Sequence, residues 1–195
     1  MRPKQIGILG GTFDPPHIAH LIIAQAILEK LKLDEIRFIP SNIPPHKKND
    51  KITPARHRFE MLKLAVSGHP RFKVSDLEVK RGGISYTIDT LRELSLPKSK
   101  KKLYLILGSD NLKQLPGWRN PKDIYRLARV VLVRRPGSML SSLYRRAKKT
   151  VTVEVPLLEV SSSKIRQMIR SGRSIKWWVP EEVREYIEKH KLYRR

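Results

Sequence analysis

Residues 6–20 read Ile-Gly-Ile-Leu-Gly-Gly-Thr-Phe-Asp-Pro-Pro-His-Ile-Ala-His, a short apolar run that leads into a polar turn. The apolar run is typical of a buried strand, and Gly10 and Gly11 let the backbone turn tightly and approach a ligand. His17 and His20 stand three apart at the start of an apolar-periodic segment, so on a helix they face the same way. Because the first amides of a helix lack partners within it, this arrangement predicts an anion site with two imidazole donors.

The two histidines also permit other interpretations. They could cap the helix or lie in solvent, and pairs with this spacing occur in zinc sites. However, the chain has no cysteine and no His-Glu-x-x-His pattern that would supply a third ligand. The stretch also lacks the Gly-Lys-Ser/Thr of a Walker loop and the three-glycine spacing of a dinucleotide fingerprint. We therefore favour phosphate binding.

Composition narrows the class of protein. A chain of 195 residues is expected to form a single domain spanning 1–195. No apolar run has membrane-spanning length and the N-terminus has no signal-peptide core, so we expect a cytoplasmic protein that does not contact a membrane. The net charge of +23 favours an anionic partner. The basic residues are spread along the chain without interleaved aromatic residues, which argues against nucleic acid, and a heat-adapted surface would also explain them.

Short apolar runs alternate with amphipathic segments, which predicts an α/β fold with a doubly wound parallel sheet. We predict strands at 5–9, 36–39, 72–74, 103–107, 130–133 and 151–155, and helices at 17–31, 53–68, 87–94, 121–128, 141–148, 161–169 and 181–190. In the first helix the inward residues are predicted to be Ile18, Leu21, Ile22, Leu28 and Leu31. Residues 75–83 are read as irregular, with a short strand as an option. The C-terminal helical part, about 161–195, is expected to pack on the sheet domain.

Polar candidates follow four of the predicted strands. Gly10 follows the first strand, Asn42 the second, Gly108 the fourth and Ser161 the sixth. In a doubly wound sheet the carboxyl ends of the strands meet at one edge, where ligands bind. The sequence therefore predicts one site at this edge.

Two of these candidates are consistent with a nucleotide. Ser161-Ser162-Ser163-Lys164-Ile165-Arg166 opens a helix with hydroxyls and cations, which suits a polyphosphate; a serine cap beside surface charges explains it equally well. Gly108-Ser109-Asp110 places a carboxylate where it could accept from a ribose hydroxyl, although Asp110 could also simply cap a helix.

Other candidates suit a small aromatic acid. Tyr86-Thr87 at a helix start offers hydroxyl and amide donors for a carboxylate, or forms an ordinary cap. Here Thr87 is the expected cap residue. Trp118, after a Leu-Pro-Gly turn, could stack on a ring or be half-buried packing. The long polar loop 41–51, with Pro44-Pro45-His46-Lys47, is of a length that is usually functional or mobile.

Taken together, these residues resemble the nucleotidylyltransferase superfamily with its Rossmann-like fold. Residues 10–20 resemble the first signature of the superfamily, with Ala19 where glycine is usual, and residues 160–166 resemble the second, with Val160 and Ser163 replacing isoleucine and threonine. Residues 85–90, Leu107-Gly108-Ser109-Asp110, Trp118 and the 44–47 loop are similar to the bacterial nicotinate-nucleotide adenylyltransferases. The resemblance covers nearly the whole chain, in order.

The resemblance implies adenylyl transfer from ATP to nicotinate mononucleotide, which gives deamido-NAD and pyrophosphate in NAD biosynthesis. The residues that it implies are catalytic His17, His20 and Arg166; ATP-binding Gly10, Thr12, Phe13, Gly108, Asp110, Ser161, Ser163 and Ile165; and acceptor-binding Asn42, Lys47, Tyr86, Thr87 and Trp118. Mg²⁺ is expected to be carried by the ATP phosphates, with no dedicated protein site.

Two alternatives remain open at this stage. Another member of the superfamily would use phosphopantetheine, glycerol phosphate or nicotinamide mononucleotide as acceptor. A basic nucleic-acid-binding module would bind oligonucleotides with strong salt dependence. A homo-oligomer is compatible with the sequence.

Overall fold

The structure is a computed structural model that describes residues 2–45, 52–96, 101–134, 150–156 and 158–194. Of Asp110 it describes the backbone alone. Lys47 and the helix predicted over 141–148 lie outside the described residues.

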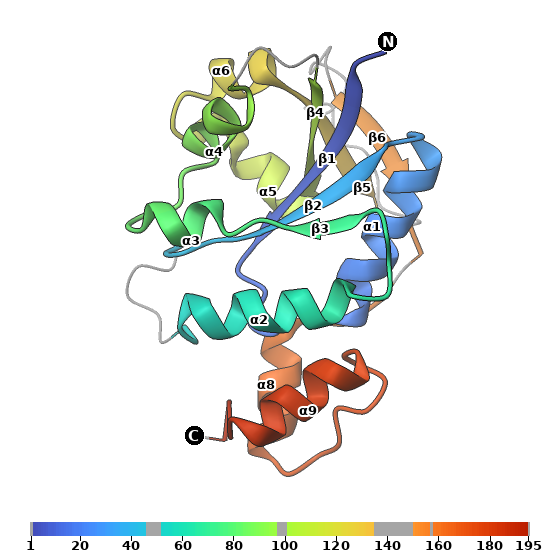
Figure 1. Cartoon of the computed structure of the whole chain (residues 1–195), viewed down its shortest axis with the longest axis vertical. Coiled ribbons are helices and arrows are strands. Elements are labelled where there is room, and N and C mark those ends of the chain that lie inside the picture. Colours follow the sequence, from blue (N-terminus) through green and yellow to red (C-terminus); the bar gives the residue numbers. More distant parts are fainter. Residues whose placement is uncertain (1, 46–51, 97–100, 135–149, 157, 195) are drawn as a thin grey trace.

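The described strands form one parallel sheet, which confirms the predicted fold class. They are β1 (Lys4–Gly11), β2 (Glu35–Pro40), β3 (Phe72–Val74), β4 (Lys101–Gly108), β5 (Ala128–Arg134) and β6 (Thr150–Glu154). Their order is β3-β2-β1-β4-β5-β6, and each neighbouring pair is parallel. The chain thus leaves β1 in one direction and returns to extend the sheet in the other, which makes β1 and β4 the switch point of a doubly wound sheet. β1 crosses the centre of Figure 1.

Helices cover both faces of the sheet. The helical elements are α1 (Ile18–Lys30), α2 (Ala55–Val66), α3 (Leu77–Arg81), α4 (Thr87–Leu94), α5 (Ser109–Gln114), the 3₁₀ turn η2 (Leu115–Gly117), α6 (Pro121–Leu127), α8 (Ser162–Arg170) and α9 (Glu181–Lys189). In Figure 1, α1 lies on one side of the strands and α4, α5 and α6 on the other, while α8 and α9 lie beyond α2 at the end opposite the N-terminus.

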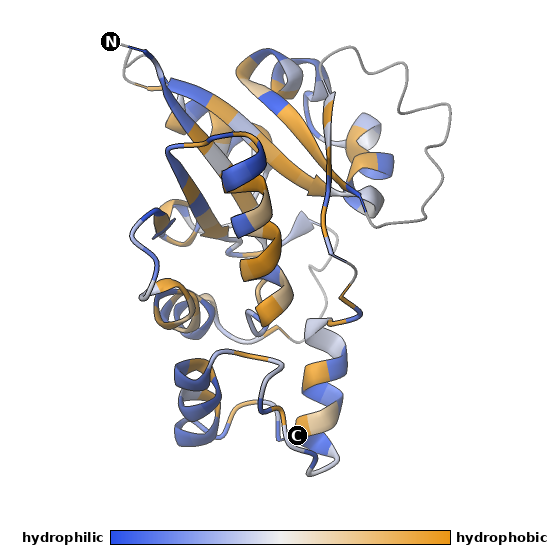
Figure 2. Cartoon of the chain, turned by 90° about the vertical axis from the view of Figure 1, so that its right-hand side faces the viewer, coloured by the Kyte–Doolittle hydropathy of each residue, from blue (hydrophilic) through white to orange (hydrophobic). Residues whose placement is uncertain are grey.

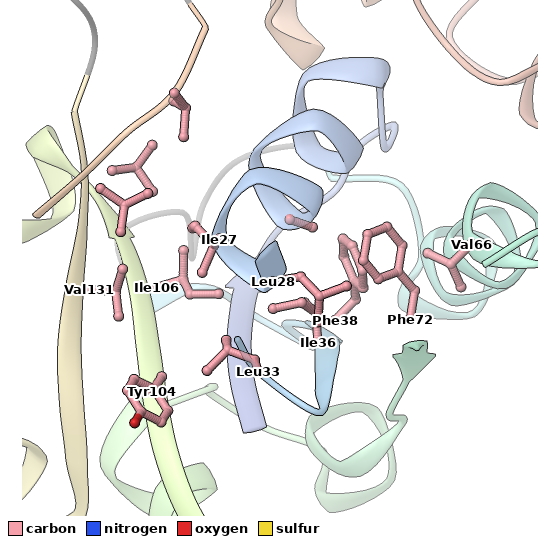
Figure 3. Packing of buried hydrophobic residues seen from close by; sticks show 14 of the residues in the cluster. Ile27, Leu28, Leu33, Ile36, Phe38, Val66, Phe72, Tyr104, Ile106 and Val131 are labelled. Carbon is pink, nitrogen blue, oxygen red and sulfur yellow. The ribbon is translucent and has the colours of Figure 1, made fainter. Parts of the chain in front are cut away.

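The two faces of the sheet have separate apolar cores. On one face, Ile27 and Leu28 of α1 pack with Ile106 of β4 and with Phe38 of β2. Figure 3 shows Phe38 beside Phe72 between α1 and α2, with ring centroids 5.4 Å apart. The alternation of inward and outward residues along each strand directs its apolar side chains to both faces.

The second core and a third cluster complete the packing. On the opposite face, Ile88 and Leu91 of α4 pack against β1, β4 and β5. A third cluster joins α2 to the C-terminal helices through Met61, Ile165 and Val183. The C-terminal helical part is therefore anchored through α2, close to the carboxyl ends of the strands.

Several local predictions differ from the structure. Residues 77–81, read as irregular, form the short helix α3. The cap of α4 is Tyr86, so Thr87 is its first helical residue. In α1 the buried residues are Ala19, Ala24, Ile27 and Leu28, so of the predicted inward set only Leu28 is fully buried. The reason is that apolar residues are not confined to one face of α1, which reads IAHLIIAQAILEK; in Figure 2 the helix is hydrophobic over much of its length.

Candidate nucleotide and acceptor site

The segment between β1 and α1 is a strained loop. Gly10 and Gly11, where the sequence suggests a turn, continue β1, and the left-handed backbone falls instead on Phe13, with a φ of 51°. A non-glycine residue in this region persists only where its surroundings hold it. The ring of Phe13 is buried against Phe38 and meets the His20 ring edge-on, with centroids 4.9 Å apart.

His17 and His20 form a stacked pair at the start of α1. Their ring centroids lie 3.7 Å apart, and the backbone N–H of His17 donates to Nδ1 of His20 over 3.1 Å. Since Nδ1 of His20 is an acceptor, the proton of the neutral ring is on Nε2. Nδ1 of His17 is buried and has no hydrogen-bond partner in the described part of the chain.

Both imidazoles favour the neutral form. Burial lowers the pKa of His17 to about 4. Burial, together with the neighbouring His17, lowers the pKa of His20 well below its ordinary value of 6.5. At neutral pH the pair therefore offers hydrogen bonds without a net charge.

The start of α8 lies against this loop. Nη1 of Arg166 donates to the carbonyl oxygen of Asp14 over 2.7 Å, and the Ser162 hydroxyl donates to that of Pro15 over 2.8 Å. The Ser161 hydroxyl caps α8 by accepting from the N–H of Lys164 over 3.2 Å. The amides of Ser162 and Ser163 donate to no atom among the described residues. The structure thus brings the serine-led helix start and the histidine loop together.

A cavity of about 520 Å³ opens beside the carboxyl ends of β1, β2 and β4. Of the residues named from the sequence, Gly10, Thr12, Tyr86, Thr87 and Trp118 line it. The amides of Thr87 and Ile88, at the start of α4, donate to no atom in the described residues. The wall thus combines apolar side chains with a helix N-terminus, a combination that suits a ring carrying a carboxylate.

The remaining named residues lie elsewhere. Asn42 donates through Nδ2 to the carbonyl oxygen of Gly83 over 3.0 Å and is not among the cavity-lining residues. Gly108 caps α5, and Asp110 is the second residue of that helix. The side chain of Ile165 is fully buried, and its N–H donates to the Ser161 carbonyl.

Sequence reasoning missed two buried polar residues near the site. Arg58 on α2 is 1% exposed, and Glu78 on α3 is a buried residue of the cavity wall. Burial raises the pKa of Glu78, and hydrogen bonds from Thr90 and Ser85 offset only part of this rise. The signal for Arg58 is its spacing, since residues 58, 61, 62 and 66 share the buried face of α2.

Comparison with known proteins shows the family to which this chain belongs. The model of the cytidylyltransferase-like family matches residues 8–168. With a parallel sheet of this order and a site at its carboxyl edge, the chain belongs to the cytidylyltransferase-like family.

Curated relatives narrow the class further. A protein of Geobacillus thermodenitrificans is 44% identical over 97% of this chain and 86% of its own length. One of Bacillus licheniformis is 43% identical over 97% of this chain and 98% of its own length. Both are named "Probable nicotinate-nucleotide adenylyltransferase", and these matches confirm the resemblance found in the sequence.

The fold also has a solved counterpart. A nicotinic acid mononucleotide adenylyltransferase of Plasmodium falciparum, complexed with APC, superposes with a TM-score of 0.81 over 97% of both chains at 22% identity. At this identity the likeness concerns the fold. No helix in the described residues is long and apolar enough to cross a membrane.

Proposed function

We infer that the protein transfers the adenylyl group of ATP to nicotinate mononucleotide and releases deamido-NAD and pyrophosphate. The observation that carries this is that the loop lining one side of the cavity continues along the chain into the histidine pair. Gly10 and Thr12 line the cavity, and the same loop then reaches the stacked imidazoles and the start of α8. An aromatic acid and a triphosphate can therefore occupy adjoining places. The full-length relatives named nicotinate-nucleotide adenylyltransferase support the choice of acceptor.

The reaction requires alignment more than proton transfer. A phosphate oxygen of the mononucleotide forms a bond to the α-phosphorus of ATP, and the bond from that phosphorus to the oxygen bridging to the β-phosphate breaks. The attacking phosphate is already anionic at neutral pH, so no general base is needed. The protein must hold attacker and leaving group in line and stabilise the charge that develops.

The loop and α8 supply the groups for that task. We assign the triphosphate to His17 and His20, whose neutral rings can donate, and to Arg166 and the hydroxyls of Ser161 and Ser163. The hydrogen bond that fixes His20 Nδ1 leaves its Nε2–H as the donor.

Other residues complete the two substrate sites in this proposal. Gly108 and Asp110 contact the adenosine ribose, and Gly10, Thr12 and Phe13 contribute backbone groups to the cleft. Lys47, with Asn42, reaches phosphate from the 41–51 loop. Tyr86, Thr87 and Trp118 bind the nicotinate end.

The proposed reaction also involves a metal ion. A divalent metal accompanies ATP in nucleotidyl transfer, and we propose Mg²⁺, which neutralises phosphate charge when bound. The described residues contain no group of three His, Asp or Glu side chains that could hold a metal ion. We propose that the ion arrives with ATP as part of the substrate, with phosphate oxygens as its main ligands, because Mg²⁺ is usually held by substrate phosphates and a few protein oxygens.

Replacement of the cavity tryptophan tests the acceptor assignment. Since stacking on an aromatic side chain is worth about 1–3 kcal/mol, Trp118→Ala should raise the KM for nicotinate mononucleotide about tenfold or more and change the KM for ATP little. Steady-state kinetics with each substrate varied in turn measure both constants. Trp177→Ala is the matched control, since Trp177 is 81% exposed and lies outside the cavity. Equal losses for both substrates in the Trp118 variant would contradict the assignment.

A further inference from the structure

Arg58 is a buried cation that has no carboxylate in hydrogen-bond contact among the residues that the structure describes. Its side chain, on the first turn of α2, is 1% exposed. Its hydrogen bonds all go to backbone carbonyl oxygens: Nε to Thr53 over 2.8 Å, Nη1 to Thr12 over 2.8 Å and to Ser41 over 2.6 Å, and Nη2 to Asn42 over 2.9 Å. An arginine is rarely buried in this way unless its surroundings use every donor.

The carbonyl oxygens that accept hydrogen bonds from Arg58 belong to the two loops that follow β1 and β2 beside the site. Thr12 follows β1 and leads directly to Phe13 and the histidine pair. Ser41 and Asn42 follow β2 and are the first residues of the 41–51 loop. Thr12 and Ser41 both line the 520 Å³ cavity. One guanidinium therefore fixes the distance between the ends of two neighbouring strands, where the two halves of the proposed site meet.

The loop after β1 needs such a restraint. Phe13 holds a φ of 51°, which a non-glycine residue keeps only when its neighbours enforce it. The carbonyl of Thr12 immediately precedes this residue, and the ring of Phe13 lies 4.9 Å from that of His20. The path from Arg58 to His20 thus runs through one hydrogen bond, one strained residue and one ring contact.

Charge explains why a cation is required there. Four carbonyl oxygens converge on one point, and each has its negative end directed at Arg58. The buried carboxylate of Asp14 favours the cation electrostatically, while it accepts hydrogen bonds itself from the N–H of Thr53 and the hydroxyl of Tyr193. Without the guanidinium, the carbonyls would remain buried, close together and unsatisfied.

We propose that Arg58 is a positioning residue that sets the spacing of the β1 and β2 loops and thereby aligns His20 with the reacting phosphates. It acts through the backbone of Thr12 and Ser41 and touches no substrate. A lysine at this position would keep the charge, but its single nitrogen cannot reach carbonyls that are spread around a planar fork. The consequence for turnover rests on the proposed function; the geometric link to His20 does not.

The test uses three variants of the full chain: Arg58→Lys, Arg58→Met and the control Arg56→Met, which removes an exposed cation from the same helix turn. Each is assayed by pyrophosphate release well below its own melting temperature. We expect kcat to fall about 10²-fold in Arg58→Met, to recover only partly in Arg58→Lys, and to stay at the wild-type value in Arg56→Met. If Arg58→Met does not fold, the lysine variant carries the test.

A second readout is independent of catalysis. The ring ¹⁵N and ¹H resonances of His20 in the ligand-free protein should shift in both Arg58 variants and not in Arg56→Met, because ring contacts with Phe13 and His17 set them. The proposal would be overturned if a folded Arg58 variant kept the His20 resonances of the wild type. It would also be overturned if the wild-type protein is active and an Arg58 variant has the same kcat. If the wild-type protein is inactive but the His20 resonances still shift in the Arg58 variants, the result would count against the proposed function and support the positioning role.

Discussion

At the scale of single residues, the stacked imidazoles make stability depend on pH. Burial lowers the pKa of His17 to about 4 in the folded chain, while an unfolded chain keeps an ordinary value near 6.5. Between these values the unfolded chain binds a proton that the folded chain does not, so stability falls as the pH falls from about 6.5 to about 4. A shift of this size corresponds to about 3 kcal/mol.

Urea unfolding of the ligand-free protein between pH 4 and pH 7 measures this dependence. We expect a steeper loss of unfolding free energy in the wild type than in His17→Asn, which keeps a good helix cap and has no proton to gain. Other titrating groups act in both proteins and largely cancel in the comparison. The same slope in both would show that His17 does not titrate in the manner described.

Gly10 offers a second test at this scale. A Cβ built on Gly10 meets no atom within 4 Å, and Gly10 lines the cavity. Gly10→Ala should therefore fold with nearly unchanged stability and bind substrates more weakly. The added methyl group would contact no protein atom and would occupy only space that a ligand needs. Thermal melting and KM values measure the two effects. Gly7→Ala is the contrasting variant, since its Cβ would lie 2.4 Å from Cδ1 of Ile36 and should lower stability. Unaltered KM values in Gly10→Ala would remove this glycine from the site.

At the scale of elements, a tyrosine hydroxyl near the C-terminus adds a further tie to the first motif. Tyr193, in the segment after α9, donates to Oδ1 of Asp14 in the β1–α1 loop over 2.6 Å. Tyr193→Phe should lower the free energy of unfolding by about 2 kcal/mol, as expected for a hydrogen bond to a charged group. Chemical denaturation measures it, with Tyr125→Phe on α6 as a control that removes a hydroxyl far from Asp14. Equal changes in the two variants would show that the tether is not specific.

The elements also show which sequence signals are reliable. Runs such as Leu103–Leu107 are apolar on both faces and bounded by polar residues, so the strands were predictable, and the topology follows from their alternation with helices. Residues 77–81 alternate apolar and charged side chains over a length too short to separate strand from helix. The buried face of α1 was not predictable, because apolar residues surround the helix.

The candidate site was predictable where chemistry is carried by a motif and unpredictable where it is carried by burial. The neighbourhood of Asp14–Pro15 with the start of α8 follows from strand ends meeting at one edge. Arg58 escaped prediction because it stands in a charged stretch at a helix start, where arginine is normally exposed. Its four backbone acceptors come from two loops, after β1 and after β2, which only the folded chain brings together.

At the scale of the whole molecule, the strand order brings the carboxyl ends of β1, β2 and β4 to one edge of the sheet, beside the cavity. β1 and β4 part there, and α8 and α9 are held nearby through α2. Figure 1 shows these helices at the end of the molecule opposite the N-terminus. A net charge of +23 favours the approach of anionic nucleotides to any part of this surface, so charge contributes attraction while the cavity contributes selectivity.

The central claim is that one edge of this sheet joins a nicotinate-bearing phosphate to the α-phosphorus of ATP. Pyrophosphate release from ATP and Mg²⁺, measured with nicotinate mononucleotide, nicotinamide mononucleotide and phosphopantetheine in turn, tests it most directly. We predict turnover that depends on the acceptor, is fastest with nicotinate mononucleotide and yields deamido-NAD. Turnover with phosphopantetheine alone, or no pyrophosphate with any of the three, would contradict the account.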